Sequence, residues 1–447
     1  EGAIGLINWY ALHPTAMNYY NRLISGDHKG YASLTMEQAL GAQPGDFVAA
    51  FAQADPGDVT PNTNLDNTGP GTTDVETTQI MGERQLAVAR ELFDSATTRL
   101  VGPLDTRQLY VDLSNYPVRD EFTGAGVQHT CPSAYGYSFA GGSTEDGGGH
   151  FLFYEGMTEQ RAWRDWLIGV VTGAPKPTDA VRACQAPKPI LFETGSGNPP
   201  LQSQVRSFTV ARIGQLVLLA VPAEVTTMSG RRLRASVMEV AGDWAEHIVL
   251  AGYANGFAGY VTTPEEYQLQ QYEAAHTLHG AWSLPAYQQI STQLTSALTS
   301  GATISGTAAF DDWRGKAEGL PLPRSAATAP GVRQRLPGTA LPLQRNAFRA
   351  GDIVRIEFSS AHPNDAFPRL TQYLQVQQKT ASGWQTIADE DNWHTRIRWR
   401  EDGDSYFAEL SWVVPENTSS GTYRMVHSGF NREGAAFEGA SQEFTVN

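Results

Sequence analysis

Residues 215–224 are QLVLLAVPAE, an unbroken apolar run that ends in a proline, an alanine and a carboxylate. The apolar residues Leu216–Val221 predict a short buried strand. A second apolar run, Ile248–Tyr253, predicts another buried strand. Between the two runs, Thr226–Val240 has the composition and length of a helix. Strand, helix and strand in this order predict a layered α/β or α+β domain.

The same alternation continues towards the N-terminus. Ile4–Leu12 and Asp46–Ala52 predict short strands, and the apolar spacing over Thr77–Ala96 predicts an amphipathic helix. Arg107–Leu113 alternates like a strand that places Leu109, Val111 and Leu113 on one face. We therefore predict that residues 1–318 form an α/β domain, with a mixed sheet and flanking helices.

The character of the chain changes near residue 319. Residues 319–345 hold five prolines and predict a linker or a long surface excursion. Four segments rich in β-formers follow: Ile353–Phe358, Thr371–Gln377, Tyr406–Trp412 and Tyr423–Phe430. Short strands at this spacing predict an all-β, immunoglobulin-like sandwich over residues 346–447.

Composition excludes several classes of protein. The chain has 447 residues, with 32 Lys and Arg against 47 Asp and Glu, and its net charge is −15. Such an acidic chain repels phosphate backbones, so nucleic acid is not an expected partner. A hydrophobic content of 41% and an aromatic content of 10% argue against general disorder. No apolar run approaches the length of a membrane span.

The two cysteines, Cys131 and Cys184, are either two unrelated buried thiols or one disulfide. Neither lies in a C-x-x-C pair, which disfavours a metal or redox motif. Few lysines, many small polar residues and the acidic balance are typical of an exported protein. We therefore favour the disulfide, and a secreted or periplasmic location.

Common hydrolase and nucleotide-binding motifs are absent from the sequence. Some polar residues nevertheless follow predicted strands. His13 precedes Pro14 at a strand end, and Glu224 follows the apolar run and leads into a helix. Thr60 lies in the turn 55–62, where a hydroxyl could act as nucleophile or hydrogen-bond donor. Each residue taken alone has a simpler interpretation. His13 would be a structural histidine, Glu224 a solvated carboxylate, and Thr60 part of a plain turn.

Aromatic residues crowd residues 252–272, where three glycines accompany Tyr253, Phe257, Tyr260, Tyr267 and Tyr272. Aromatic residues at this density usually belong to a core. Glycines that let backbones approach closely, followed by the acidic pair Glu265–Glu266, indicate a pocket wall instead. The pattern alone leaves both interpretations open.

Taken together and in order, these segments resemble the neutral ceramidases. Residues 7–15 (INWYALHPT) resemble the family's strand ending in His-x-Thr, residues 24–30 (ISGDHKG) its S-[GS]-D-N-K-G turn, and residues 57–62 (GDVTPN) its G-D-V-S-P-N hexapeptide. Residues 140–147 (AGGSTEDG) resemble its A-G-S-T-E-D-G loop, and residues 222–224, 252–255 and 260–263 complete the series. The resemblance covers nearly the whole chain, including the C-terminal sandwich.

The resemblance implies a zinc amidase domain at residues 1–318 that hydrolyses ceramide to fatty acid and sphingosine with metal-activated water. It implies His13, Glu224 and Tyr260 as zinc ligands beside one further histidine, and Tyr272 as the donor that stabilises the oxyanion. This fits catalytic zinc, which needs few protein ligands and an open position for water. The family also pairs cysteines at segments matching Cys131 and Cys184.

Three departures from the family pattern bear on the chemistry. Thr60 replaces the hexapeptide's serine, which favours a metal-water mechanism with Thr60 as a shaping or hydrogen-bonding residue. The sequence has no H-x-H element, which the family carries upstream of the Ile4–His13 strand. We therefore expect an upstream chain or segment that supplies the remaining zinc histidine. Residues 390–395 match the family's divalent-cation loop only loosely, so a structural Ca²⁺ or Mg²⁺ is a weaker expectation.

Two other functions stay open. One is an amidase for another N-acyl substrate, such as fatty-acyl amino acids, because the substitutions at Thr60 and His28 leave room for it. The other is a secreted binding protein without catalysis. A lipid amide as substrate would also bring the protein into contact with a membrane surface.

Overall fold

The computed structural model describes residues 2–21, 25–41, 45–149, 151–172, 176–195, 200–309, 312, 336–363, 372–403 and 405–447. The chain forms two compact units, which are described separately. Unit 1 comprises residues 1–19 and 26–318, and unit 2 comprises residues 20–25 and 319–447. Each unit has a hydrophobic core of its own.

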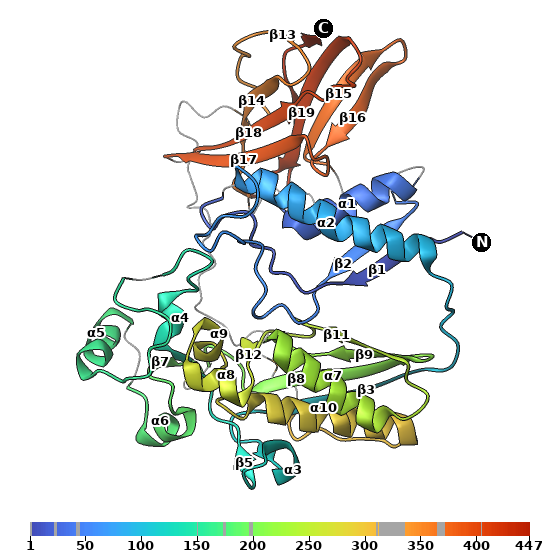
Figure 1. The fold of residues 1–447 in the computed structure, drawn as a ribbon. Coiled ribbons are helices and arrows are strands. Elements are labelled where there is room, and N and C mark those ends of the chain that lie inside the picture. The colour runs from blue at the N-terminus through green and yellow to red at the C-terminus, as the bar shows by residue number, and fades with distance from the viewer. Residues whose placement is uncertain are drawn as a thin grey trace. The chain divides into compact units, whose positions relative to one another are not determined.

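A mixed four-stranded sheet forms the centre of unit 1 (Figure 1). Its strands lie in the order β11 (His247–Ala251), β9 (Leu216–Ala220), β8 (Val205–Ile213) and β3 (Leu104–Asp112). Strand β11 runs parallel to β9, and the other two pairings are antiparallel. The turn between β8 and β9 contains Gly214 at a φ of 60°, a backbone conformation that favours glycine. The two apolar runs of the sequence are thus the parallel pair.

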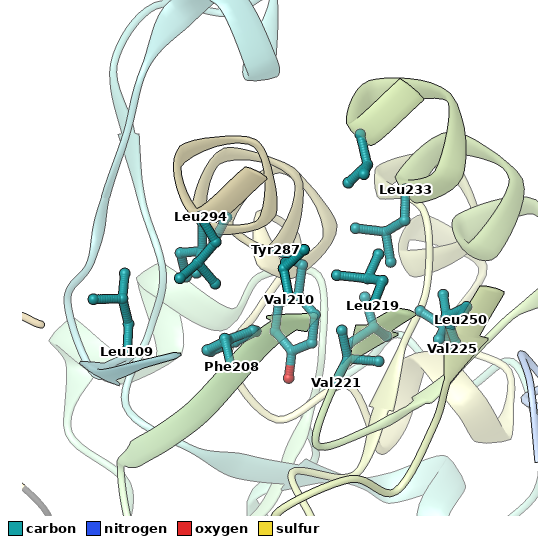
Figure 2. Packing of buried hydrophobic residues seen from close by; sticks show 14 of the residues in the cluster. Leu109, Phe208, Val210, Leu219, Val221, Val225, Leu233, Leu250, Tyr287 and Leu294 are labelled. Carbon is teal, nitrogen blue, oxygen red and sulfur yellow. The ribbon is translucent and has the colours of Figure 1, made fainter. Parts of the chain in front are cut away.

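Helices α7 (Thr227–Ala241) and α10 (Ser283–Ser300) cover this sheet, and Figure 2 shows side chains that pack between them. Helix α7 forms the crossover between the parallel strands β9 and β11. It begins where the Thr226 side chain accepts a hydrogen bond from the Ser229 N–H. Residues of this core include Leu109, Phe208, Val210, Leu219, Leu233, Leu250, Tyr287 and Leu294. The core therefore fixes where β9 ends, four residues before Glu224.

A second, two-stranded parallel sheet in unit 1 carries His13. Strands β1 (Gly5–Trp9) and β2 (Val48–Ala52) pair in register, and helices α1 (Asp27–Leu40) and α2 (Asp74–Ser95) pack with them (Figure 1). Met36, Phe47 and Phe51 are among the buried residues of this cluster. The chain leaves β1 at Trp9 and reaches His13 four residues later.

Several short strands and helices complete unit 1. Strand β10 (Glu224–Val225) pairs in parallel with β12 (Tyr260–Val261), and β6 (Ala134–Gly136) pairs with β7 (Ile190–Glu193). Strand β4 (Pro117–Val118) pairs with β5 (Gln128–His129). The short helices are α3 (Asp120–Thr123), α4 (Tyr137–Gly141), α5 (Ala162–Thr172), α6 (Asp179–Gln185), α8 (Pro264–Leu269) and α9 (Tyr272–Ala275).

A disulfide joins Cys131 to Cys184 at a Cα–Cα distance of 5.8 Å. The disulfide expected from the sequence is therefore present.

Unit 2 is built from two sheets around one core. The smaller sheet orders β14 (Ile353–Ser360), β18 (Ser405–Val413) and β17 (Thr395–Asp402). The larger orders β13 (Ala347–Phe348), β21 (Phe444–Val446), β19 (Gly421–Phe430), β15 (Leu374–Thr380) and β16 (Gly383–Asp389), with β20 (Ala436–Ala440) on β19. Trp412 of one sheet and Tyr423 of the other pack in the same buried cluster. The arrangement is all-β, while its likeness to immunoglobulin domains stays a prediction.

The proline-rich segment lies partly outside the described residues, which resume at Leu336. Its described end pairs with β14, because the Leu341 N–H donates to the Glu357 carbonyl at 2.7 Å and Ala340 bridges to Phe358. Ala340 and Leu343 of this segment pack against the core of unit 2, to which the segment belongs. Among the helices described, none has the length and apolar character needed to cross a bilayer.

Candidate active site

Three predicted zinc ligands converge in unit 1, although up to 247 positions separate them in the sequence. The Nε2 atom of His13 lies 2.5 Å from the Glu224 Oε2 atom and 3.1 Å from the Tyr260 hydroxyl. Glu224 and Tyr260 are directly opposite each other in the β10–β12 pair, so their side chains share one face. Both are buried, and His13 is partly buried.

The backbone around Val59 orients His13. The carbonyl of Val59 accepts a hydrogen bond from the backbone N–H of His13 at 3.0 Å and lies 3.1 Å from its Nδ1 atom. A carbonyl can only accept, so Nδ1 carries a proton and donates it to Val59. The contact of Nε2 with the Glu224 carboxylate also needs a proton, whose place a bound zinc ion would take. This is the arrangement that metal-binding histidines commonly have.

The side chain of His28 holds the backbone of the same segment. It is fully buried, and its Nε2 atom lies 2.8 Å from the carbonyl oxygen of His13, while Nδ1 lies 2.8 Å from Gln85 Nε2. The ring therefore donates to the carbonyl and accepts from the amide. The histidine that replaces the family's usual asparagine thus holds the backbone of a candidate ligand.

Charge and burial oppose each other in this cluster. Burial by itself lowers the pKa of His13, but the hydrogen bond and charge of Glu224 outweigh it and leave that pKa raised. Burial raises the pKa of Glu224, while its hydrogen bond to His13 and the charge of that ring lower it by more. Burial and the Glu224 charge raise the pKa of Tyr260 far above its ordinary value. Glu224 is therefore favoured as the anion of the cluster.

The donor set fits a zinc ion. Imidazole nitrogen and carboxylate oxygen bind zinc at about 2.0–2.2 Å, so donors in a tetrahedral site stand about 3.4 Å apart. The separation of Tyr260 from His13 is close to this value, and that of Glu224 from His13 is shorter. Over the described ranges there is no cluster of three or more His, Cys, Asp or Glu side chains suited to a metal. Among the described residues, this cluster brings together two such side chains, His13 and Glu224, and the phenol of Tyr260.

Tyr253 is a further contact of Glu224 that the sequence placed only in an aromatic cluster. Burial, followed by the charge of the neighbouring Glu224 carboxylate, raises the pKa of the Tyr253 hydroxyl. Its φ of 57° is uncommon for an aromatic residue. A tyrosine in a sequence does not indicate a positive φ, so the sequence carried no signal for this contact.

Tyr272 and His276 form an aromatic wall beside the cluster. The Tyr272 ring centroid lies 5.7 Å from that of Tyr260, and the His276 ring lies 5.1 Å from Tyr260 and 4.8 Å from Phe139. Burial first, and then the charge of Glu224, raise the pKa of Tyr272 to about 12. Its hydroxyl therefore keeps its proton at neutral pH and can donate. His276 was not predicted, because a lone histidine in this sequence context gives no sign of burial.

Thr60 contacts another part of the site. Its hydroxyl donates to the Asp146 Oδ1 atom at 2.8 Å, and the Asn62 side-chain amide donates to the same oxygen at 2.6 Å. The hexapeptide 57–62 is thus tied to the loop 140–147, the two segments that resemble family motifs. The charge of Asp146 also contributes to raising the pKa of His13.

The predicted cation loop of unit 2 is held by its own backbone. The Glu390 carboxylate accepts hydrogen bonds from the N–H groups of Tyr373 and Leu374, each at 3.2 Å. The hydroxyl of Thr395 donates to the carbonyl of Asp389. These contacts hold the loop in place, and the structural Ca²⁺ or Mg²⁺ stays a prediction.

The fold and the motifs at this site define the class of protein, and the chain belongs to the neutral/alkaline non-lysosomal ceramidase family. Residues 1–289 match the N-terminal model of the neutral/alkaline non-lysosomal ceramidases, and residues 338–446 match the C-terminal model. The resemblance seen in the sequence is thereby confirmed.

Individual relatives are neutral ceramidases. That of Pseudomonas aeruginosa is 38% identical over 434 residues, which cover 95% of this chain and 63% of the relative. Neutral ceramidase B of Dictyostelium discoideum is 34% identical, over 98% of this chain and 66% of its own. A solved ceramidase complexed with C2 has a TM-score of 0.87 at 34% identity, covering 99% of this chain and 70% of that one. The chain thus spans about two thirds of the length of these relatives.

Proposed function

We propose that this chain hydrolyses the amide bond of a lipid, with ceramide as the substrate and fatty acid and sphingosine as products. The convergence of His13, Glu224 and Tyr260 is the observation that carries the proposal. The names of the relatives support the choice of substrate. A zinc ion held by these three residues would polarise the amide carbonyl and activate water when bound.

The residues of the chain have distinct roles in this proposal. Val59 holds the His13 ring, and the β10–β12 register holds Glu224 beside Tyr260, so the donors are positioned before substrate arrives. Tyr272 donates a hydrogen bond to the oxyanion that develops on the amide carbonyl. Because the Thr60 hydroxyl already donates to Asp146, we assign Thr60 to shaping the loop contact and not to nucleophilic attack.

We also propose that the fourth zinc donor is a histidine of an upstream chain or segment. The described part of unit 1 presents His13 and Glu224 as the ionisable donors of the cluster, together with the Tyr260 phenol. The disulfide supports a secreted or periplasmic location. The upstream donor would be refuted if mass spectrometry found only this 48.6 kDa chain in a preparation that has full activity in the assay.

Replacement of Glu224 by glutamine tests the function. Glutamine keeps the shape of the side chain but lacks the anionic oxygen, so we expect Glu224→Gln to lower ceramide hydrolysis by more than about 100-fold and to reduce bound zinc. Circular dichroism should show an unchanged fold. Fatty acid release and metal content are the measurements.

The matched control is Glu265→Gln, which alters an exposed carboxylate that pairs with Arg232 on the surface. This variant should keep its activity and zinc. Retained activity in Glu224→Gln would remove Glu224 from the ligand set. Preferential cleavage of fatty-acyl amino acids over ceramide would support the other amidase, and a protein without zinc or hydrolysis would support a binding protein.

A further inference from the structure

Helix α5 exposes an apolar side. Trp163, Trp166, Val170 and Val171 are 52%, 65%, 64% and 74% exposed. These positions recur with helical spacing, so they lie on one side of α5. Trp163 and Trp166 are also the two tryptophans with exposed side chains in the part of the chain that the structure describes. A surface helix normally shows the opposite pattern, with its polar residues outward.

The other side of α5 is anchored to unit 1. Ile168 packs in a buried cluster with Tyr137 and Met157. The Asp165 carboxylate accepts a hydrogen bond from the Tyr137 hydroxyl at 2.5 Å and forms an ion pair with Arg182 at 3.3 Å. The orientation of α5 is therefore set by specific contacts, and its apolar side is not needed for the core of unit 1.

Basic residues accompany this apolar side. From Arg161 to Arg182 the sequence has four basic and two acidic residues, in a chain whose net charge is −15. The Arg164 guanidinium lies 4.7 Å from the centre of the Trp163 ring, while the exposed Arg161 already forms an ion pair with Glu159. Tryptophan beside arginine is typical of helices that lie in the interface of an anionic membrane, where the ring enters the interface and the guanidinium contacts phosphate.

Helix α5 is connected to the candidate active site through α4. Tyr137, which packs against α5, is the first residue of α4, and Phe139 lies two positions later. The Phe139 ring centroid lies 4.8 Å from His276 and 5.8 Å from Tyr272. Figure 1 shows α5, α4 and α9 in the same part of unit 1. A surface contacted by α5 would thus be linked to the wall of the site by one short helix.

We propose that the apolar side of α5, together with Arg164, docks the protein onto an anionic phospholipid bilayer. The choice of a bilayer rests in part on the proposed function, because a lipid amide is dissolved in such a surface. The tryptophan rings insert at the level of the headgroups, and the Arg164 guanidinium pairs with a lipid phosphate. Docking in this way requires no hydrolysis, so it can be measured separately.

Vesicle binding tests the proposal. The full chain should co-sediment with vesicles of phosphatidylcholine and phosphatidylglycerol, and more weakly with phosphatidylcholine alone. Trp163→Ser with Trp166→Ser should lower the partition coefficient by about tenfold or more. Arg164→Ala should lower binding to the anionic vesicles selectively. The matched control is Val88→Ser with Leu92→Ser, which removes two apolar residues of α2 that are 56% and 59% exposed and should leave binding unchanged.

Three results would overturn the docking surface. The first is equal vesicle binding by the tryptophan variant and the parent chain. The second is a dimer of the parent chain that the tryptophan variant dissociates, which would assign the face to a second copy. The third is protection of both tryptophans from acrylamide quenching without vesicles, which would assign the face to another protein segment. Vesicle binding without ceramide hydrolysis, in a preparation that also contains the upstream donor, would support docking and refute the proposed function alone.

Discussion

The imidazole of His276 is buried among five aromatic rings, those of Tyr135, Phe139, Phe257, Tyr260 and Tyr272. Neither ring nitrogen has a hydrogen-bond partner in the structure. Burial lowers the pKa of His276 to about 4, so the ring is neutral at physiological pH. A buried polar group without a partner carries an uncompensated desolvation cost of about 1–3 kcal/mol.

We therefore expect His276→Phe to raise the free energy of unfolding by about 1 kcal/mol. Phenylalanine keeps a planar ring in the aromatic cage and removes both unpaired nitrogens, and its slightly larger size offsets part of the gain. Urea denaturation at pH 7 measures the change.

The control for this substitution is His427→Phe in unit 2. His427 is also fully buried, but its Nδ1 lies 2.9 Å from the Tyr373 carbonyl oxygen and its Nε2 lies 2.9 Å from the Ser360 hydroxyl. Its loss leaves two polar groups unpaired, so this variant should be less stable by about 2 kcal/mol. A destabilised His276→Phe would show that the nitrogens of His276 do have partners, such as buried water.

At the scale of the element, strand β19 carries a pH-sensitive contact. Burial lowers the pKa of His427 to about 4, against an ordinary value of 6.5. The folded chain therefore keeps this ring neutral, while the unfolded chain takes up a proton as the pH falls below 6.5. The part of the free energy of unfolding that depends on this difference in pKa is fully present above pH 6.5. It is lost as the pH falls from 6.5 to about 4. It amounts to about 3 kcal/mol in all.

Chemical denaturation of His427→Leu and of the parent chain at pH 7 and pH 4.5 measures this effect. The variant should be less stable at pH 7, because Ser360 and the Tyr373 carbonyl lose their partner. The difference between the two proteins should shrink at pH 4.5. A constant difference would show that His427 titrates normally in the folded chain.

Strands and helices differed in how well the sequence predicted them. The apolar run at 216–221 corresponds to β9, and Ile353–Phe358 falls within β14, because short runs rich in β-formers favour a strand over a helix. Helix α10 was not predicted. It buries Gln289, Ser291 and Thr295 in addition to its apolar residues, so it lacks the polar stripe that identifies a surface helix.

At the scale of the whole molecule, the disulfide constrains unit 1 alone, because both cysteines lie there. The bridge closes a loop with a sequence separation of 53 residues. Loop-closure entropy for this length predicts that Cys131→Ser with Cys184→Ser destabilises unit 1 by about 4 kcal/mol.

Hydrogen exchange followed by mass spectrometry resolves the two units in this experiment. Peptides from the α7 and α10 core should exchange faster in the double serine variant, and peptides from β14 and β18 should not change. Equal acceleration in both units would show that they unfold together. Reduction of the parent chain with dithiothreitol should reproduce the effect without any substitution.

The sequence by itself determined the alternation of strand and helix, the β-rich C-terminal part and the family, because these depend on local apolar patterns and short motifs. It favoured the disulfide, which the structure then showed. It named His13, Glu224 and Tyr260 as zinc ligands by resemblance, and their roles stay a prediction. Only the tertiary structure decided that these three side chains meet, that Val59 and His28 hold His13, and that α5 turns its tryptophans outward. Such contacts join residues that the chain keeps far apart, and packing alone brings them together.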